Sequence, residues 1–343
     1  MDNNQNILKV SNLIMKFPIK SDFIFKKKMF LSAVDNVSFN LKQGDSIGIV
    51  GESGSGKTTV GRIISRLLRP TSGSIVFEGK EVSNITGKEL KMFMPNIQTV
   101  FQDPYTSLNP KLTIGEIISE PMKINNWGSK NKINKRTKHL IDLVGLPQAS
   151  IYRYPSDFSG GQRQRIAICR AIAINPKIVI CDEAVSALDV SMQAKILNLL
   201  VDLKNDLKLT YIFISHDLSV VRMICDKIIV MYMGKIVETS PSEKFFKKQY
   251  HPYAEALIES IPDPYSVKGF SSLKGEIENN INLPVGCNFQ NRCKYVQEAC
   301  KKYSPNLREI ENNRFATCFK YNDFQNDNLI NKKEEYELNK KNV

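Results

Sequence analysis

A glycine-rich segment has residue types and a spacing suited to binding phosphate. Residues 51–58 fit the pattern G-x-x-x-x-G-K-[ST]. Its glycines let backbone N–H groups curl around phosphate oxygens, its lysine can reach the β- and γ-phosphates, and its threonine hydroxyl can bind Mg²⁺. The apolar run Ile47–Val50 before it and the helix-like run Thr58–Leu68 after it favour this interpretation over an ordinary glycine turn. The expected nucleotide contacts are Gly51, Ser53, Gly54, Ser55, Gly56, Lys57, Thr58 and Thr59.

Two acidic residues follow a short apolar run further along the chain. The run Ile178–Cys181 is typical of a buried strand, and Asp182 and Glu183 come directly after it. A buried strand that ends in a carboxylate is one way in which nucleotide-hydrolysing proteins present a metal ligand. We therefore expect Asp182 to hold Mg²⁺ together with Thr58, and Glu183 to act as the general base on the attacking water.

A second glycine-rich helix start lies between these two segments. Ser159, Gly160, Gly161 and Gln162 precede the helix-like run Arg163–Ile174. Backbone N–H groups at such a position bind anions. Because one nucleotide does not need two such surfaces from one chain, we expect this segment to contact a nucleotide that is bound to a second chain.

Together these segments resemble the ATPase subunit of ATP-binding-cassette (ABC) transporters, with residues 159–162 as the signature motif. The resemblance implies that Gln102 senses Mg²⁺, that Asp189 helps to bridge two ATPase chains, and that His216 contacts the γ-phosphate. It also implies that Phe17 stacks on adenine, although an early phenylalanine can equally belong to the core. The catalytic residues implied are Lys57, Gln102, Glu183 and His216, and the Mg²⁺ ligands implied are Thr58, Gln102 and Asp182.

Further segments resemble one branch of this family, the oligopeptide and dipeptide importers. They are Phe101–Tyr105, Ser107–Pro110, Arg153–Pro155 and His251–Tyr253. The extra segment Pro18–Ser32 resembles the F-type ATPase subunit of those importers. The chain departs from the family at Ala184, where proline is usual after the catalytic glutamate. Alanine there removes no reactive group, so we expect little effect on the mechanism.

Strand-like and helix-like runs alternate through most of the chain, which predicts an α/β fold. The resemblance implies a P-loop ABC ATPase domain over residues 1–260, with a mixed β-sheet core and an inserted helical subdomain at about 105–170. Prolines, glycines and serines predict a linker over 261–285. A small cysteine module is expected over 286–320. The polar composition of 321–343 predicts a disordered tail.

Four cysteines lie close together in the sequence near its end, at Cys287, Cys293, Cys300 and Cys318. Four thiolates suit Zn²⁺ or a [4Fe–4S] cluster, and the spacing alone does not separate the two. Because residues 286–293 resemble the C-terminal module of peptide-importer ATPases, some of which bind an iron–sulfur cluster, the cluster is the favoured prediction. Zinc and no metal are the alternatives. Arg292 could moderate the charge of the cluster or be an ordinary surface arginine.

The composition limits the cellular location and the binding partners that can be expected for the chain. Lysine and arginine exceed the acids by 48 to 35, a net charge of +13, which suits polyanions or a solvated surface. No apolar run approaches the ~18 residues of a membrane span, and Met1–Val10 lacks the pattern of a signal peptide. We therefore expect a peripheral protein on the cytoplasmic side of the cell membrane.

The favoured function is ATP hydrolysis that energises the import of oligopeptides or dipeptides. The partners implied are a second ABC ATPase subunit in a heterodimer, two membrane permease subunits and an extracellular substrate-binding protein, with no nucleic acid. The importer could instead carry nickel, glutathione or another small solute. The alternative from another class is a soluble ABC ATPase that acts on ribosomes or DNA, and a third is a regulatory nucleotide-binding module without turnover.

Overall fold

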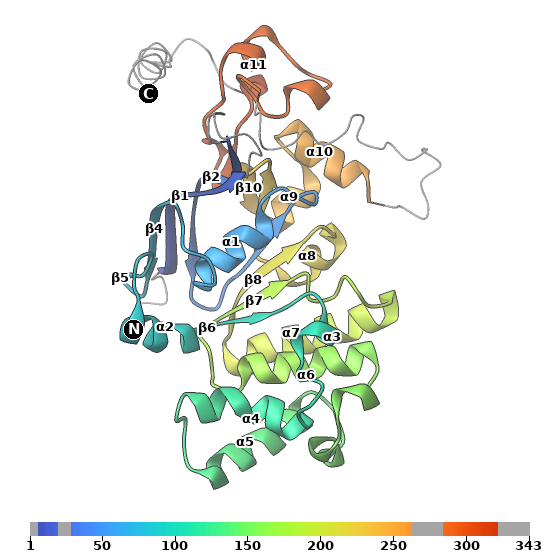
Figure 1. Cartoon of the computed structure of the whole chain (residues 1–343). Helices are drawn as coiled ribbons and strands as arrows, with labels where there is room; N and C mark the ends of the chain where they lie inside the picture. The colour runs from blue at the N-terminus through green and yellow to red at the C-terminus, as the bar shows by residue number, and fades with distance from the viewer. Residues whose placement is uncertain (1–5, 20–28, 262–283, 322–343) are drawn as a thin grey trace.

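Two β-sheets organise the chain in the computed structural model, which describes residues 6–19, 29–261 and 284–321 (Figure 1). A four-stranded antiparallel sheet has the order β2-β1-β4-β5, and an eight-stranded mixed sheet has the order β11-β12-β10-β9-β3-β8-β7-β6. The strands are β1 (Asn6–Ile19), β2 (Met29–Lys42), β3 (Ser46–Val50), β4 (Ser72–Phe77), β5 (Lys80–Glu81), β6 (Ile97–Val100), β7 (Ile178–Asp182), β8 (Thr210–Ser215), β9 (Lys227–Tyr232), β10 (Lys235–Pro241), β11 (Arg308–Glu311) and β12 (Arg314–Ala316).

Helices lie between the sheets and on the other face of the larger sheet (Figure 1). They are α1 (Lys57–Ile64), α2 (Gly87–Phe93), α3 (Pro104–Ser107), α4 (Ile114–Ile124), α5 (Lys130–Leu143), α6 (Gly160–Ile172), α7 (Val190–Leu207), α8 (Leu218–Ile224), α9 (Ser242–Lys247), α10 (Pro252–Glu259) and α11 (Glu298–Lys302). No helix of the described residues has the length and hydropathy that a membrane span requires.

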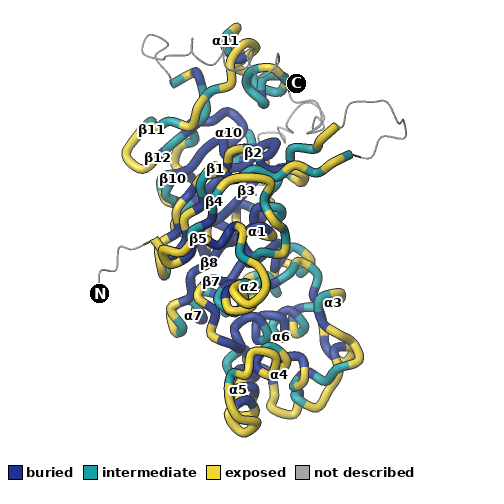
Figure 2. The backbone as a smooth tube through the Cα atoms, turned by 60° about the vertical axis from the view of Figure 1, so that its left-hand side comes forward, coloured by how far each residue is buried: buried dark blue, intermediate teal, exposed yellow. Residues whose placement is uncertain are grey.

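The centre of the larger sheet is parallel and buried on both faces. Strands β6, β7, β8, β3 and β9 run parallel to one another, and every residue of β3, β7 and β8 is buried (Figure 2). Alternate residues of β7 face opposite cores, as strand geometry requires. Ile178 and Ile180 pack in one core with Val60 of α1, and Val179 packs in the other with Leu200 of α7. Such strands are nearly continuous apolar runs, as the sequence showed at Ile47–Val50 and Ile178–Cys181.

The stretch 105–170 contains helices and no strands, in agreement with its predicted helical character. Helices α4 and α5 pack against α6, and together they form the lower part of Figure 1. The domain limits drawn from the sequence stay a prediction.

The C-terminal segment joins the ATPase sheet directly. Strand β12 pairs antiparallel with β10, through Ala316 opposite Glu238, and β11 pairs with β12. The chain after 284 therefore continues the larger sheet at its edge. Most of the predicted linker (262–283) and tail (322–343) lies outside the described residues, as does 20–28 within the segment that resembles the F-type subunit.

The end of one helix differs from the prediction, and a side-chain cap sets the start of another. Helix α1 ends at Ile64 instead of Leu68, because Arg66 takes a left-handed backbone conformation with φ of 62°. Helix α7 begins at Val190, directly after Asp189. The carboxylate of Asp189 caps it by accepting a hydrogen bond from the backbone of Met192.

Candidate nucleotide-binding site

The phosphate-binding loop connects β3 to α1, at the carboxyl end of a central buried strand. Two of its glycines are required by space and by backbone conformation. Gly51 has a φ of 151°, and a Cβ atom there would lie 2.2 Å from the carbonyl oxygen of Met231. Gly56 has a φ of 99°, and its Cβ would lie 2.2 Å from the carbonyl oxygen of Ala33. The loop therefore packs closely against strands β2 and β9 and can present its N–H groups outward.

Lys57 is folded onto the loop and is only 4% exposed. Its Nζ donates hydrogen bonds to the carbonyl oxygens of Gly51 at 2.7 Å and Glu52 at 2.8 Å. Burial lowers the pKa of Lys57, while Glu183, Asp182 and Glu52 act in the opposite direction. A buried cation that is held by weak carbonyl partners is well placed to bind phosphate instead.

Thr58 and Asp182 meet as the sequence predicted, although they come from α1 and β7. The hydroxyl of Thr58 donates to Oδ1 of Asp182 at 2.9 Å. Burial raises the pKa of Asp182, and the hydrogen bond from Thr58 opposes that shift. A hydroxyl and a desolvated carboxylate side by side are hard oxygen donors of the kind that Mg²⁺ uses beside phosphates. These residues therefore fit a magnesium ion.

Glu183 lies between Gln102 and His216, two residues that the resemblance to ABC ATPases also assigned to the site. Its Oε2 accepts a hydrogen bond of 2.9 Å from Nε2 of Gln102, and its Oε1 lies 3.3 Å from Nδ1 of His216. The three residues follow β7, β6 and β8, which are neighbours in the sheet. Since the carboxyl ends of parallel strands meet at one edge, the fold gathers residues that are far apart in the sequence.

The signature motif lies on a different part of the chain from the phosphate-binding loop. Ser159 caps α6 in a reciprocal arrangement, in which its backbone donates to Oε1 of Gln162 at 3.0 Å. Gly161 lies under Met192 of α7, where a Cβ atom would be 2.4 Å from that side chain. Helix α6 lies with α4 and α5, whereas α1 lies with β1–β4 (Figure 1). The structure thus does not bring the phosphate-binding loop and the signature motif of one chain together.

Phe17 lies on β1 opposite Leu31 of β2 and is half-buried. It belongs to neither buried apolar cluster of the described residues. A partly exposed aromatic ring is compatible with stacking on adenine, and this role stays a prediction.

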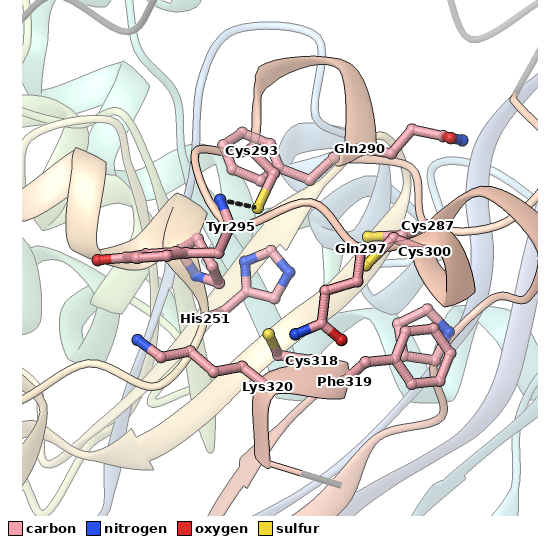
Figure 3. Close-up of a pocket in the computed structure, with 13 residues that line it drawn as sticks. His251, Cys287, Gln290, Cys293, Tyr295, Gln297, Cys300, Cys318, Phe319 and Lys320 are labelled. Atoms are coloured by element: carbon pink, nitrogen blue, oxygen red, sulfur yellow. Dashed lines mark hydrogen bonds between the residues drawn. The ribbon is translucent and has the colours of Figure 1, made fainter. Parts of the chain in front are cut away.

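The four cysteines line one pocket, together with His251 and Phe319 (Figure 3). Burial raises the pKa of Cys287 to about 12 and that of Cys318 to about 11, so these groups are neutral thiols when no metal is bound. Among the described residues, no three His, Cys, Asp or Glu side chains stand at metal-holding positions. The four cysteines thus share one pocket, while the cysteine module and the metal in it stay predictions.

Sequence reasoning missed the surroundings of Glu52, a variable position of the phosphate-binding loop. Its backbone N–H donates to the hydroxyl of Tyr253 at 2.7 Å, and its carboxylate binds Arg292. The Arg292 side chain is 5% exposed, so Arg292 is not the ordinary surface arginine that one interpretation expected, and its effect on the charge of a cluster stays a prediction. No local pattern could have linked residues 240 positions apart.

Comparisons with known proteins agree with this geometry. Residues 34–186 match the ABC transporter family, and residues 237–300 match the oligopeptide/dipeptide transporter C-terminal region. The oligopeptide transport ATP-binding protein AppF of Bacillus subtilis is 45% identical over 324 residues, which cover 93% of this chain and 98% of AppF.

Two solved structures are similar over the ATPase part. A dimeric post-hydrolysis structure of the ATP-binding cassette MJ0796, bound to ADP and Pi, is 30% identical with a TM-score of 0.61, and covers 68% of this chain and 98% of that one. The structure of cbiO1 from Clostridium perfringens is 26% identical with a TM-score of 0.62, and covers 71% of this chain and 92% of that one. With an identity of 45% to AppF along nearly its whole length, the chain belongs to the ATP-binding proteins of the ABC transporter family, in the oligopeptide/dipeptide transporter branch.

Proposed function

We propose that this chain is the ATP-hydrolysing subunit that energises the import of oligopeptides or dipeptides by an ABC transporter. The observation that carries the ATPase assignment is the position of Glu183 between Gln102 and His216, next to the Thr58–Asp182 pair. The assignment to peptides is supported by the name of AppF and by the match to the oligopeptide/dipeptide C-terminal region.

The residues divide the work of phosphoryl transfer to water. Lys57 and the loop N–H groups would bind the phosphates, and Thr58, Asp182 and Gln102 would hold Mg²⁺. The ion supplies charge neutralisation on the phosphate oxygens when it is bound. Glu183 accepts the proton of the attacking water, and its hydrogen bond from Gln102 orients the carboxylate. His216 would contact the γ-phosphate.

A second ATPase chain completes the site in this proposal. Ser159, Gly160 and Gly161 would close over a nucleotide that is bound to the loop of the other chain, and that chain would return the same contacts. The dimeric form of MJ0796 with ADP and Pi supports a dimer of ATPase chains. We propose a heterodimer of ATPase subunits on the cytoplasmic side of the membrane, with two permease subunits and an extracellular substrate-binding protein.

The cysteine pocket is the proposed site of a [4Fe–4S] cluster, with Zn²⁺ as the alternative. Four thiols line it, and Phe289 and Phe319 beside them would help to shield a metal centre from water. Anaerobic purification followed by iron, sulfide and zinc analysis tests this. Colourless protein without metal would contradict it.

The function as a whole is tested by trapping the assembled complex. Glu183→Gln should bind ATP without turnover and hold the two ATPase chains closed. We expect affinity purification of this variant from native membranes to recover two permeases and a second ATPase, identified by mass spectrometry. Recovery of ribosomes or DNA-associated proteins would favour the soluble ATPase instead. Nickel, glutathione and peptides are then compared as ligands of the matching substrate-binding protein.

A further inference from the structure

Arg292 extends from the cysteine segment to the phosphate-binding loop. Its Nη1 and Nη2 donate to Oε2 and Oε1 of Glu52 at 2.7 and 2.9 Å, so the guanidinium holds both carboxylate oxygens. The Arg292 side chain is 5% exposed and that of Glu52 is 23% exposed. A two-pronged, partly desolvated ion pair is strong and directional, and loss of either member leaves a charge without compensation.

Three protein side chains hold Glu52 in place without any contribution from a nucleotide. Its backbone N–H donates to Tyr253, its carbonyl oxygen accepts from Lys57, and its carboxylate binds Arg292. Gly51, directly before it, packs against β9 with no room for a side chain. The conformation of the loop around Glu52 is therefore set by contacts with α10, β9 and the C-terminal segment.

The turn that carries Arg292 also touches the cysteine pocket. It follows Phe289, which is 3% exposed and lines that pocket together with His251. The Phe289 ring packs on Tyr232 of β9 and Tyr253 of α10, with ring centroids 5.2 and 5.5 Å apart. Two ATPase elements and one short turn thus share an aromatic cluster, and Arg292 extends from that turn to the loop.

We propose that Arg292 is a positioning residue for ATP binding, which acts through Glu52 and couples the phosphate-binding loop to the packing of residues 284–321. The inference rests on the proposed function in that the loop must bind ATP. Lys57 has to leave the carbonyl oxygens of the loop when phosphate arrives, and a fixed Glu52 keeps the loop in place while this happens. Without the contact between Arg292 and Glu52, ATP itself would have to order the loop, and the entropy lost in doing so weakens ATP binding.

Coupling of this kind has two measurable consequences. Because Arg292 acts on the phosphate-binding loop through Glu52, its loss should change ATP affinity more than the rate at saturating ATP. Because coupling is reciprocal, ATP should stabilise the segment around Arg292 by the factor that the segment contributes to ATP affinity.

The experiment compares Arg292→Gln, Glu52→Gln and the double variant. We expect Arg292→Gln to weaken ATP binding about tenfold, a typical size for coupling between two sites, with kcat changed less than about twofold. The double variant should bind ATP no more weakly than whichever single variant binds it more weakly, because each single change already breaks the ion pair between Arg292 and Glu52. Arg292→Lys keeps the charge but loses the fork, so it should fall between wild type and Arg292→Gln.

Lys301→Gln is the matched control. Lys301 is a cation of the same segment, next to Cys300, and its ion pair with Glu298 is exposed. Hydrogen–deuterium exchange in a Glu183→Gln background gives the second readout. ATP should slow exchange of residues 285–300 in the background variant and with Lys301→Gln, and should lose this effect with Arg292→Gln.

Three results would overturn the proposal. They are unchanged ATP affinity in a folded Arg292→Gln variant, additive losses in the double variant, and equal ATP protection of residues 285–300 with and without Arg292. Where Arg292→Gln lowers the melting temperature, Arg292→Lys supplies the comparison instead. Absence of ATP binding in the wild type would instead contradict the proposed function.

Discussion

Glu183 has a backbone conformation that few non-glycine residues adopt, with φ of 49°. Its backbone N–H donates to the carbonyl oxygen of Ile214 at 2.9 Å, which ties it to β8. The turn directs its carboxylate toward Gln102 and His216. Strain of this kind persists where the surroundings fix it, and it is frequent at reaction centres.

Replacement of Glu183 by glutamine tests its role as the base. The amide keeps the size and the hydrogen bonds but cannot accept the proton, so ATP turnover should fall at least about 100-fold while ATP still binds. Phosphate release and nucleotide titration measure the two properties separately. Glu78 also follows a strand with positive φ, but its carboxylate pairs with Lys177, so Glu78→Gln is the control. Turnover of Glu183→Gln within about twofold of wild type would contradict the assignment.

At the scale of single elements, a substitution at the cap of α6 can separate the stability of the helix from its role in catalysis. Ser159 caps α6 in the signature motif, and Ser129 caps α5 by accepting from the backbone of Lys132. Aspartate caps helices about as well as serine. If Ser159 also faces the γ-phosphate of a nucleotide on another chain, a carboxylate there repels that phosphate.

We therefore expect Ser159→Asp to melt within a few degrees of wild type and to lose most ATPase activity in the assembled complex. Ser129→Asp makes the same substitution at a cap away from the signature motif, and it should keep both stability and activity. Thermal unfolding and phosphate release give the two readouts. Equal ATPase activity in the two variants would argue against a phosphate contact at Ser159.

A buried carboxylate where β10 pairs with β12 gives a second prediction at the scale of single elements. Glu238 is 0% exposed, and its Oε2 accepts from the backbones of Tyr250 and His251 at 2.9 and 2.7 Å. Its other oxygen lies 3.7 Å from Nη2 of Arg314. Burial raises the pKa of Glu238 to about 7, although these hydrogen bonds and Arg314 oppose the shift.

A carboxyl group with a raised folded pKa favours the protonated form of the native state. The contribution of Glu238 to the stability of the fold is therefore fully present below its unfolded pKa near 4.5, and it is lost as the pH rises through the folded pKa of about 7. We expect wild-type unfolding free energy to drop between pH 5 and 8 by about 1–3 kcal/mol more than in Glu238→Gln. Urea unfolding at both pH values measures this. Glu311→Gln alters an exposed partner of the same arginine and should keep the wild-type slope.

Short-range patterns and long-range contacts differ in how far they could be predicted. The loop at Lys57 and the acids after β7 follow from residues that are adjacent in the sequence, and the order of apolar runs placed their strands. The pairing of β12 with β10 and the contact between Arg292 and Glu52 join distant segments, and no periodicity encodes them. The early end of α1 depends on the conformation of one residue, Arg66, whose side chain carries no signal for it.

At the scale of the whole molecule, the phosphate-binding loop lies apart from the signature motif, and this separation is the basis for the proposed sharing of sites between two chains. Lys57 belongs to the part built on β1–β4 and α1, and Ser159 to the part with α4 and α5 (Figure 1). In a complex of two ATPase chains, Lys57 would serve the nucleotide on its own chain, and Ser159 the nucleotide on the other. Substitutions at the two positions should therefore affect different nucleotides.

Photolabelling with an azido analogue of ATP in the membrane complex separates the two cases. Lys57→Ala should reduce label on this chain at least about tenfold, because the buried cation that meets the phosphates is gone. Ser159→Asp should leave the label on this chain and reduce it on the second ATPase chain, with Ser129→Asp as the control. If Ser159→Asp, while still folded, removed the label from this chain alone, the loop and the signature motif of one chain would have to meet. If Lys57→Ala reduced the label equally on both ATPase subunits, the complex would contain two copies of this chain in place of the proposed heterodimer.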